Sequence, residues 1–277
     1  MAAILAGIAP ARAAPPRIVS VFLCTDEYVF RLVPKDRIAA LSVLAGDTHP
    51  VVSTIADKVG GIPLVRASAE AVLAKHPDLV VMYKGTNPRL RALVTDAGVK
   101  ILDVPWATSL ADVRRITLML GDALGASARA RAMLKAMDTK LAAARAAAPH
   151  RPVSALIYEP NGYVTADAVS DAILAAGGLR NAAGALRQTR LGRIPVEAVV
   201  AAAPRLLILN ASREGGPALA DAALRHPALA ALKGRALIVR ASLTPLLCPG
   251  PWSADAAGEF ARLARHAAQL AMPRAGH

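Results

Sequence analysis

Aromatic residues are scarce in this chain: phenylalanine, tryptophan and tyrosine together make up 3% of its 277 residues. Cysteine occurs only as Cys24 and Cys248, which excludes the multiple-disulfide framework of small secreted proteins. No apolar run reaches the roughly 18 residues that a membrane-spanning helix needs. The sequence therefore predicts a soluble mature protein with an aliphatic core and no spanning segment.

Short catalytic signatures are missing as well. The chain has no G-x-G-x-x-G, G-x-x-x-x-G-K-[ST], G-x-S-x-G or H-E-x-x-H motif. Two cysteines are also too few thiolates for a carrier of an iron–sulfur cluster. An enzyme or a sensor on a doubly wound α/β scaffold stays open as an alternative, but the sequence points to no catalytic residue.

Acidic residues are fewer than basic ones, 20 against 33, and the formal net charge is +13. A charge of this size raises the question of nucleic-acid binding. The arginines are scattered over expected helix surfaces, however, and no basic stretch alternates with aromatic residues. We therefore expect no nucleic-acid partner, and a positive field that favours an anionic small ligand.

Two stretches 127 positions apart share one pattern: SAEAVLAKHPDLVVMY at 68–83 and PVEAVVAAAPRLLILN at 195–210. In each, Glu-Ala opens a short helical run, a proline follows seven residues after the glutamate, and an apolar run of strand length comes next. A residue before proline avoids the α region, so the helices are predicted to end near His76 and Ala203. The repeated helix–stop–strand unit predicts two similar α/β halves.

A polar residue ends the apolar run in each copy of this unit. Continuous apolar runs such as 79–82 and 206–209 are typical of parallel strands that are covered on both faces. In open α/β sheets, ligands bind at the carboxyl ends of the strands. Tyr83 and Asn210, which follow the two runs, are therefore candidate cleft residues, one from each half.

Strands and helices alternate through the rest of the chain, which predicts an N-terminal α/β lobe over 17–124 and a C-terminal one over 151–277. Besides the repeated unit, strands are expected at 17–23, 37–43, 100–104, 153–158 and 236–239, and helices at 27–32, 89–97, 110–120, 169–176 and 254–270. Between the lobes, 127–148 lacks glycine and proline and predicts a linking helix of roughly 30 Å within 125–150. Residues 1–16 have an apolar core and an Ala11-Arg12-Ala13 sequence, which indicates a secretory signal or a disordered tail.

Polar side chains follow several of the expected strands. Thr25 and Asp26 lie in the turn after the first strand, where they either cap the next helix or face an anionic ligand beside its N–H groups. Asp47 and His49 lie in the loop after the second strand, where such a pair is more often a surface feature than a ligand site. The loop after the strand at 153–158 carries Glu159, Asn161 and Tyr163.

The order of these motifs resembles the solute-binding proteins of ATP-driven metal-chelate importers, the family that binds ferric siderophores, haem and cobalamin. The resemblance runs from Arg17 to about Leu270. It rests on the order and spacing of RIVSV, SAEAVLAKHPDLVVMY, the linking helix, GYVTADAVSDAILAAGGLRNAA, PVEAVVAAAPRLLILN and CPGPW. It implies an α/β fold of two similar lobes with parallel-rich sheets, joined by one long linking helix, with a ligand cleft between them.

The resemblance also implies a function. Such a protein is a monomeric, periplasmic receptor and not an enzyme, and it has no intrinsic cofactor. It captures a metal chelate and delivers it to a membrane permease that works with an ATPase. A surface glutamate on each lobe docks on the permease in this family, and Glu70 and Glu197 are the matching positions. Both are also favourable first-turn carboxylates of short helices, which is the simpler interpretation.

The cleft residues implied by this resemblance are a mixed set. MYKGTNPRLRALVTDAGVKILDV looks closest to the cobalamin-binding branch, in which an aromatic residue stands at the position of Tyr83. The full predicted set is Thr25, Asp26, Asp47, His49, Tyr83, Lys84, Trp106, Tyr158, Tyr163, Asn210, Arg213 and Trp252. A rim for anionic siderophores would come from Lys84, Arg187, Arg190 or Arg213. Direct metal ligation by His49 or Tyr163 is an open alternative to an ordinary loop role, and we predict no metal site.

The two cysteines fall in loops that we expect near the cleft. A bridge between Cys24 and Cys248 would tie the lobes together and hinder their opening. Both a bridge and two free thiols are open from the sequence, and we expect free thiols that are reactive or face the ligand.

Overall fold

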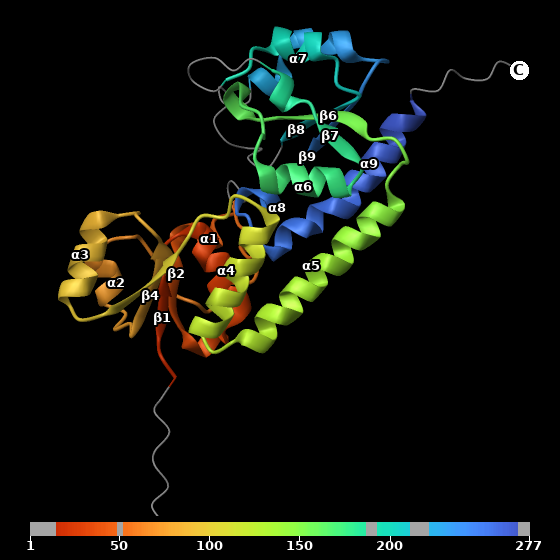
Figure 1. Cartoon of the computed structure of the whole chain (residues 1–277). Coiled ribbons are helices and arrows are strands. Elements are labelled where there is room, and N and C mark those ends of the chain that lie inside the picture. The colour runs from red at the N-terminus through yellow and green to blue at the C-terminus, as the bar shows by residue number, and fades with distance from the viewer. Residues whose placement is uncertain (1–14, 49–51, 187–192, 211–221, 271–277) are drawn as a thin grey trace, which may run out of the picture.

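The computed structural model describes residues 15–48, 52–186, 193–210 and 222–270 (Figure 1). Within these ranges the chain forms two separate parallel sheets, a five-stranded sheet in the order β3-β2-β1-β4-β5 and a four-stranded sheet in the order β7-β6-β8-β9. We call the parts of the chain built on these sheets the N-lobe and the C-lobe. The predicted α/β fold with two similar lobes is confirmed.

The N-lobe sheet is covered by helices on both faces. Its strands are β1 (Ile18–Ser20), β2 (Ile38–Ser42), β3 (Leu64–Val65), β4 (Leu79–Tyr83) and β5 (Lys100–Val104), and its helices are α1 (Leu23–Leu32), α2 (Ala69–Leu73), α3 (Pro88–Asp96) and α4 (Leu110–Ala123). Along β4, Val81 packs in the core with α1 and α4, whereas Val80 and Met82 pack in the core with α2 and α3. Because successive side chains alternate between two buried faces, the strand has to be apolar throughout.

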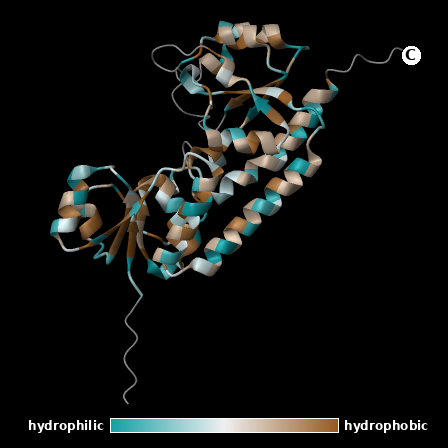
Figure 2. Ribbon diagram, in the orientation of Figure 1, coloured by the Kyte–Doolittle hydropathy of each residue, from teal (hydrophilic) through white to brown (hydrophobic). Residues whose placement is uncertain are grey.

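The C-lobe repeats this plan. Its strands are β6 (Val153–Tyr158), β7 (Leu179–Asn181), β8 (Leu206–Asn210) and β9 (Leu237–Ala241), and its helices include α6 (Ala168–Ala176), α7 (Val196–Ala202), α8 (Thr244–Leu247) and α9 (Ala257–Gln269). Along β8, Leu206 and Ile208 face α6 and α9, and Leu207 and Leu209 face α7. Figure 2 shows the same distribution in the N-lobe, where the strands are hydrophobic and polar residues lie on the outer sides of the helices.

The duplicated unit of the sequence is duplicated in space, as α2–β4 and α7–β8. The residues before the two prolines, His76 and Ala203, both have left-handed backbone angles, with φ of 47° and 43°. This conformation takes the chain out of the helix and into the strand, as the prolines predict. Helix α2 ends at Leu73, three residues earlier than expected, and α7 ends at Ala202 as expected.

Helix α5 (Ser127–Ala147) runs alongside both lobes and is the predicted linking helix (Figure 1). Its buried residues recur every three or four positions and form one stripe. Ala130, near its start, packs in the N-lobe core, and Leu141 and Ala144, farther along, pack in the C-lobe core. One helix therefore contributes to both cores. No helix in the described ranges has the length and the apolar character required to cross a bilayer.

Element boundaries at the start of the chain and at the closing helix also differ from the prediction. The first strand ends at Ser20, and α1 begins at Leu23, so Thr25 and Asp26 lie inside the first turns of α1 and do not cap it. The apolar residues that were assigned to the strand are the packed beginning of the helix. The closing helix begins at Ala257 because a 3-10 turn precedes it over Pro251–Ala256.

The expectation of free thiols is wrong: Cys24 and Cys248 form a disulfide bond across 224 positions of sequence. Cys24 lies in α1 of the N-lobe, and Cys248 directly follows α8. The chain beyond Cys248 then packs on the N-lobe, where Trp252 meets Tyr28 edge to face at 4.8 Å and lies under the guanidinium of Arg31 at 4.6 Å. The lobes are therefore tied at a second place besides α5.

Loss of this disulfide should lower the stability of the chain. A bridge that closes so long a loop removes much of the entropy of the unfolded chain, and its loss typically costs about 2 to 5 kcal/mol. We expect a Cys24→Ala/Cys248→Ala variant, or the wild type under reductant, to show this loss in chemical denaturation. Reductant should leave the double variant unchanged, and an equal effect on both proteins would contradict the role of the bond.

Candidate ligand cleft

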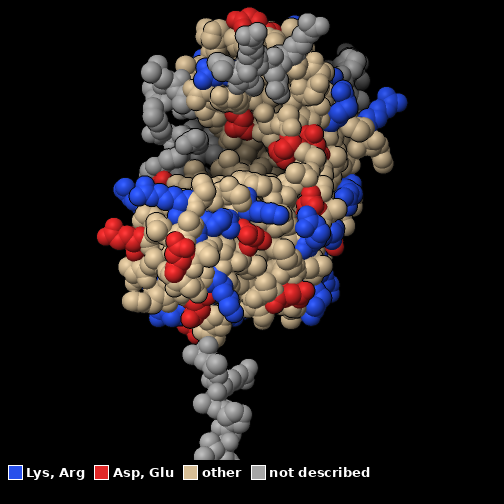
Figure 3. All heavy atoms as spheres, turned by 60° about the vertical axis from the view of Figure 1, so that its left-hand side comes forward, with Lys and Arg blue, Asp and Glu red and all other residues tan. Residues whose placement is uncertain are grey.

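A hollow separates the two lobes on the face shown in Figure 3, with the N-lobe below it and the C-lobe above. The strands of each lobe run parallel, so their carboxyl ends lie along one edge of each sheet. The disulfide brings these two edges together, because Phe22 lies just before Cys24 and Leu246 and Leu247 lie just before Cys248. We call these two edges the N-lobe wall and the C-lobe wall of the candidate cleft.

The N-lobe wall is an aromatic platform made of Phe22, Tyr83 and Trp106. These residues follow or end three neighbouring strands, β1, β4 and β5. The rings of Tyr83 and Trp106 are stacked at 3.9 Å with an angle of 7° between them, and the ring of Phe22 meets both edge to face, at 5.0 and 5.8 Å. Tyr83 is buried, whereas Trp106 is 52% exposed. Tyr83 covers one face of Trp106, and the half of the residue that remains exposed offers an aromatic surface to a flat ligand.

The end of β4 is held firmly beneath this platform. The backbone oxygen of Tyr83 accepts hydrogen bonds from the Thr86 hydroxyl at 2.8 Å and from Arg91 at 3.0 Å, and Arg91 also pairs with Asp103 at 2.8 Å. Burial raises the pKa of Tyr83 to about 12, so its phenol is neutral near pH 7. Tyr83 thus supports the indole of Trp106. The neighbouring Lys84 is exposed at the rim.

The C-lobe wall contains a cavity of about 410 Å³ at the carboxyl ends of β6 and β8. It is lined by Glu159, Val164, Thr165, Ala166, Asp167, Ser170, Asn210, Leu243, Leu246 and Leu247. Glu159 is the central polar group of this wall: one carboxylate oxygen accepts from the Thr165 hydroxyl and the other from the Asn210 amide, each at 2.5 Å. The wall thus offers hydrogen-bond acceptors beside an apolar leucine surface.

The structure brings only some of the predicted cleft residues together. Tyr83, Lys84 and Trp106 lie on or beside the N-lobe wall, and Asn210 lies on the C-lobe wall. Asp47 is half-buried after the 3-10 turn that follows β2, and Tyr163 is 41% exposed, with the Arg193 guanidinium 5.6 Å from its ring. His49, Arg187, Arg190 and Arg213 fall outside the described residues.

Four residues predicted to line the cleft are interior residues in the structure: Thr25, Asp26, Tyr158 and Trp252. The Thr25 hydroxyl bonds to Ser20 at 2.8 Å and to the Phe22 carbonyl oxygen at 2.8 Å. The Tyr158 hydroxyl donates to the Ile194 carbonyl oxygen at 3.0 Å, on the α7 side of the sheet. Trp252 fills the junction of the lobes. These four side chains are therefore held by partners inside the protein, and they do not form the surface of either wall.

Sequence reasoning missed Phe22 and undervalued Glu159. Phe22 was assigned to the first strand, although it stands beyond the carboxyl end where cleft residues are expected. Glu159 directly follows Tyr158, the last residue of β6, just as Lys84 follows Tyr83 of β4. Tyr83 is a candidate because it lies at the carboxyl end of a strand. The same criterion predicts Phe22 and Glu159 once the strand ends are placed correctly.

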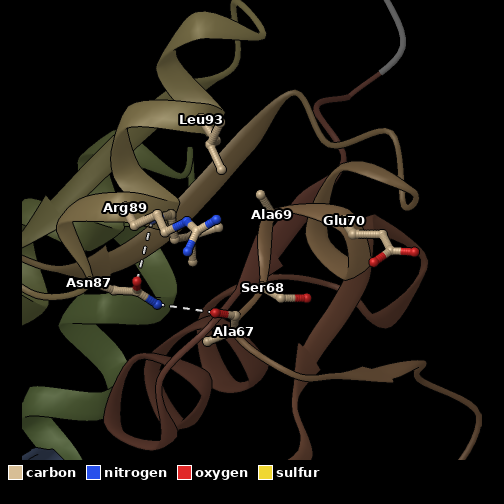
Figure 4. Close-up of a pocket in the computed structure, with 8 residues that line it drawn as sticks. Ala67, Ser68, Ala69, Glu70, Asn87, Arg89 and Leu93 are labelled. Atoms are coloured by element: carbon tan, nitrogen blue, oxygen red, sulfur yellow. Dashed lines mark hydrogen bonds between the residues drawn. The ribbon is translucent and has the colours of Figure 1, made fainter.

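The two predicted docking glutamates are exposed and lie in the first turns of equivalent helices, α2 and α7. Ser68 caps α2 by accepting from the backbone N–H of Ala71 at 3.3 Å. In Figure 4, Glu70 points outward, and Arg89 lies on the opposite side of the Ala67–Ala69 segment. Arg89 lines a shallow pocket of about 380 Å³. Glu197 lies at the rim of a pocket of about 650 Å³. The surroundings leave both carboxylates open to a partner.

Neither wall has a metal-binding cluster among the residues that the structure describes. Within the described ranges, no group of three or more His, Cys, Asp or Glu residues could hold a metal ion. Cys24 and Cys248 are in the disulfide and do not offer thiolates.

The sequence matches a family model described as periplasmic binding protein over residues 18–237, most of the chain. The chain belongs to the periplasmic binding protein family. The predicted family resemblance is thereby confirmed.

A bacterial lipoprotein matches part of the chain. The chain is 28% identical over 130 residues to the uncharacterized ABC transporter substrate-binding lipoprotein YvrC of Bacillus subtilis strain 168. That match covers 46% of this chain and only 40% of the relative.

Solved structures of binding proteins share the fold. The periplasmic heme-binding protein RhuT from Roseiflexus sp. RS-1, in apo form, superposes with a TM-score of 0.73 at 24% identity, covering 92% of this chain and 100% of that one. The periplasmic vitamin B12 binding protein BtuF of Vibrio cholerae superposes with a TM-score of 0.60 at 16% identity, covering 92% and 98%. These likenesses extend across both lobes, and they leave the ligand of this chain unassigned.

Asp26 gives a prediction about pH. Burial is the main cause that raises its pKa to about 7, and the charge of Glu27 adds to it, whereas hydrogen bonds from Ser20 and Ser42 act in the opposite direction. The folded chain therefore holds this proton more tightly than the unfolded chain, whose value is 3.8. The resulting stability is fully present below about pH 4 and is lost as the pH rises toward 7.

We expect the wild type to lose stability on the order of 2 kcal/mol between about pH 5 and pH 8 through this group. Asp26→Asn keeps the side chain neutral and should remove that loss, which urea denaturation at the two pH values measures. Exposed Asp36, changed to asparagine, is the matched control. Equal pH dependence in the wild type and Asp26→Asn would show that Asp26 does not titrate in this range.

Proposed function

We propose that this protein is the periplasmic substrate-binding component of an ABC importer and that its ligand is a metal chelate with a large flat ring. The observation that carries the proposal is the aromatic platform at the carboxyl ends of the N-lobe strands, in which Trp106 stacks on Tyr83 and is half exposed. Family membership and the likeness to YvrC support the transport role. The heme-binding protein RhuT and the vitamin B12 binding protein BtuF, which share the fold, support the ligand class.

The platform suits a preformed ring for a physical reason. An exposed indole supported from below by Tyr83 and from the side by Phe22 has little freedom left to lose when a ligand binds. Binding energy can then come from apolar area buried on a largely preformed surface. The metal remains on its own chelator, because neither wall has a cluster of ligating residues among those described.

Delivery to a permease would use the exposed carboxylates of Glu70 and Glu197. They occupy equivalent places in the two lobes, at the starts of α2 and α7. A partner that contacts both carboxylates at once would be sensitive to the distance between the lobes. This distance is set by α5 and by the Cys24–Cys248 bond. Docking at two points therefore requires both lobes to be held in this arrangement.

The ligand class can be tested with a thermal-shift screen of hemin, dicyanocobinamide and a ferric hydroxamate siderophore, followed by titration calorimetry. A ligand that binds the native state raises its melting temperature. Trp106→Ala should weaken binding of the ring chelate about 10-fold or more, because stacking on an indole is lost. Trp106→Phe should retain most of the affinity.

The control is Leu118→Ala, which removes another exposed apolar side chain, on α4. It should leave the dissociation constant unchanged. If Trp106→Ala binds the chelate as tightly as the wild type does, the platform is not the binding surface.

Docking is tested separately from binding. Glu70→Ala/Glu197→Ala should retain the wild-type dissociation constant for the chelate but fail to support uptake or to stimulate the ATPase of the importer. Glu259→Ala, which removes an exposed carboxylate on α9, should support both. Normal uptake with the double variant would rule out a docking role, and a loss of chelate affinity would place the glutamates in binding instead.

A further inference from the structure

The C-lobe wall carries negative charge that no cation of the described chain neutralises. Glu159 and Asp167 line its cavity, and Asp171 lies one turn farther along α6. Asp167 accepts from the backbone N–H groups of Val169 and Ser170, at 3.1 and 2.9 Å, and Asp171 accepts from the Asn181 amide at 2.6 Å. All of these donors are neutral.

Glu159 differs from the two aspartates in one respect. Asp167 is the N-cap of α6 and Asp171 lies in its first turn, where the helix dipole stabilises negative charge. Glu159 follows a strand and has no such support, and both of its partners, Thr165 and Asn210, are neutral side chains. Within the described ranges it makes no ion pair with lysine or arginine.

The carboxylate of Glu159 also has acceptor capacity to spare. A carboxylate offers about four lone-pair sites, and each of its two oxygens has one protein donor here. The cavity beside it is large enough for a polar side group of a ligand, and its other side is formed by Leu243, Leu246 and Leu247. A group that enters this cavity meets a negative charge and unused acceptors next to an apolar surface.

We propose that Glu159 selects the ligand by the side groups at the edge of its ring. The C-lobe wall accepts ring chelates whose side groups are neutral hydrogen-bond donors, such as carboxamides. It disfavours ring chelates that carry carboxylates. This inference rests on the proposed function, in which a ring chelate lies on the Trp106 platform, and it names the class of ring. A carboxamide donates to Glu159, whereas a carboxylate is repelled by it and leaves its lone pairs unpaired. A corrin-type ring with amide side chains fits, and a porphyrin with propionates does not.

The test compares two chelates of similar ring size, dicyanocobinamide, which has carboxamide side chains, and hemin, which has two propionates. Titration calorimetry is run on the wild type, on Glu159→Gln and on Glu259→Gln as a surface control. We expect the wild type to bind dicyanocobinamide at least about 10-fold more tightly than hemin, since a site built around one hydrogen-bonding type discriminates against the other. Glu159→Gln, which keeps the shape and removes the charge, should reduce this ratio about 10-fold, mainly by tighter binding of hemin.

The outcomes separate this inference from the function on which it rests. If hemin binds the wild type as tightly as dicyanocobinamide, or if Glu159→Gln leaves the ratio unchanged, the selection by Glu159 is refuted while the ring-binding function stands. If neither chelate binds, the proposed ligand class fails and the inference fails with it. A circular dichroism spectrum and melting temperature like those of the wild type show that Glu159→Gln is folded, and Glu259→Gln should behave as the wild type in every measurement.

Discussion

The covalent bond between Cys24 and Cys248 is the constraint on which the rest of this structure depends. It joins α1 of the N-lobe to the segment that leaves α8, at the base of the proposed cleft. Helix α5 links the same two lobes through their cores, and Trp252 adds a packed contact at the junction. Two lobes tied in this way cannot swing apart freely, so the cleft between them is largely preformed. Such a site loses less entropy on binding than one that must close around its ligand.

The two walls of this cleft have different chemistry, although the two lobes have the same plan. The N-lobe wall is aromatic, because Phe22, Tyr83 and Trp106 stand at neighbouring strand ends. The C-lobe wall has Glu159 and Asn210 at the corresponding positions of its own sheet. The net charge of +13 is therefore a poor guide to the cleft, since the charge near a ligand is set by a few side chains. The expectation of an anionic ligand came from the whole chain, and the C-lobe wall argues against it.

The sequence could predict the features of this fold that follow from local pattern. The runs at β4 and β8 are apolar because both faces of each strand are buried, and His76 and Ala203 leave the helical conformation because prolines follow them. The start of α1 could not be predicted in the same way, because Phe22 and Leu23 suit a buried strand as well as a packed helix start. That one boundary placed Thr25 and Asp26 in a loop and concealed Phe22. The disulfide and the burial of Trp252 depend on the return of the chain to the N-lobe after α8, which is a tertiary feature without a local signal.

The most direct test of this account is a crystal structure of the protein with dicyanocobinamide. The account predicts the corrin ring against the open face of Trp106, an amide of its periphery within hydrogen-bonding distance of Glu159, and the bond between Cys24 and Cys248 intact beneath it. A ring bound outside the hollow between the lobes, or a metal ligated by the sulfur of an opened disulfide, would contradict it.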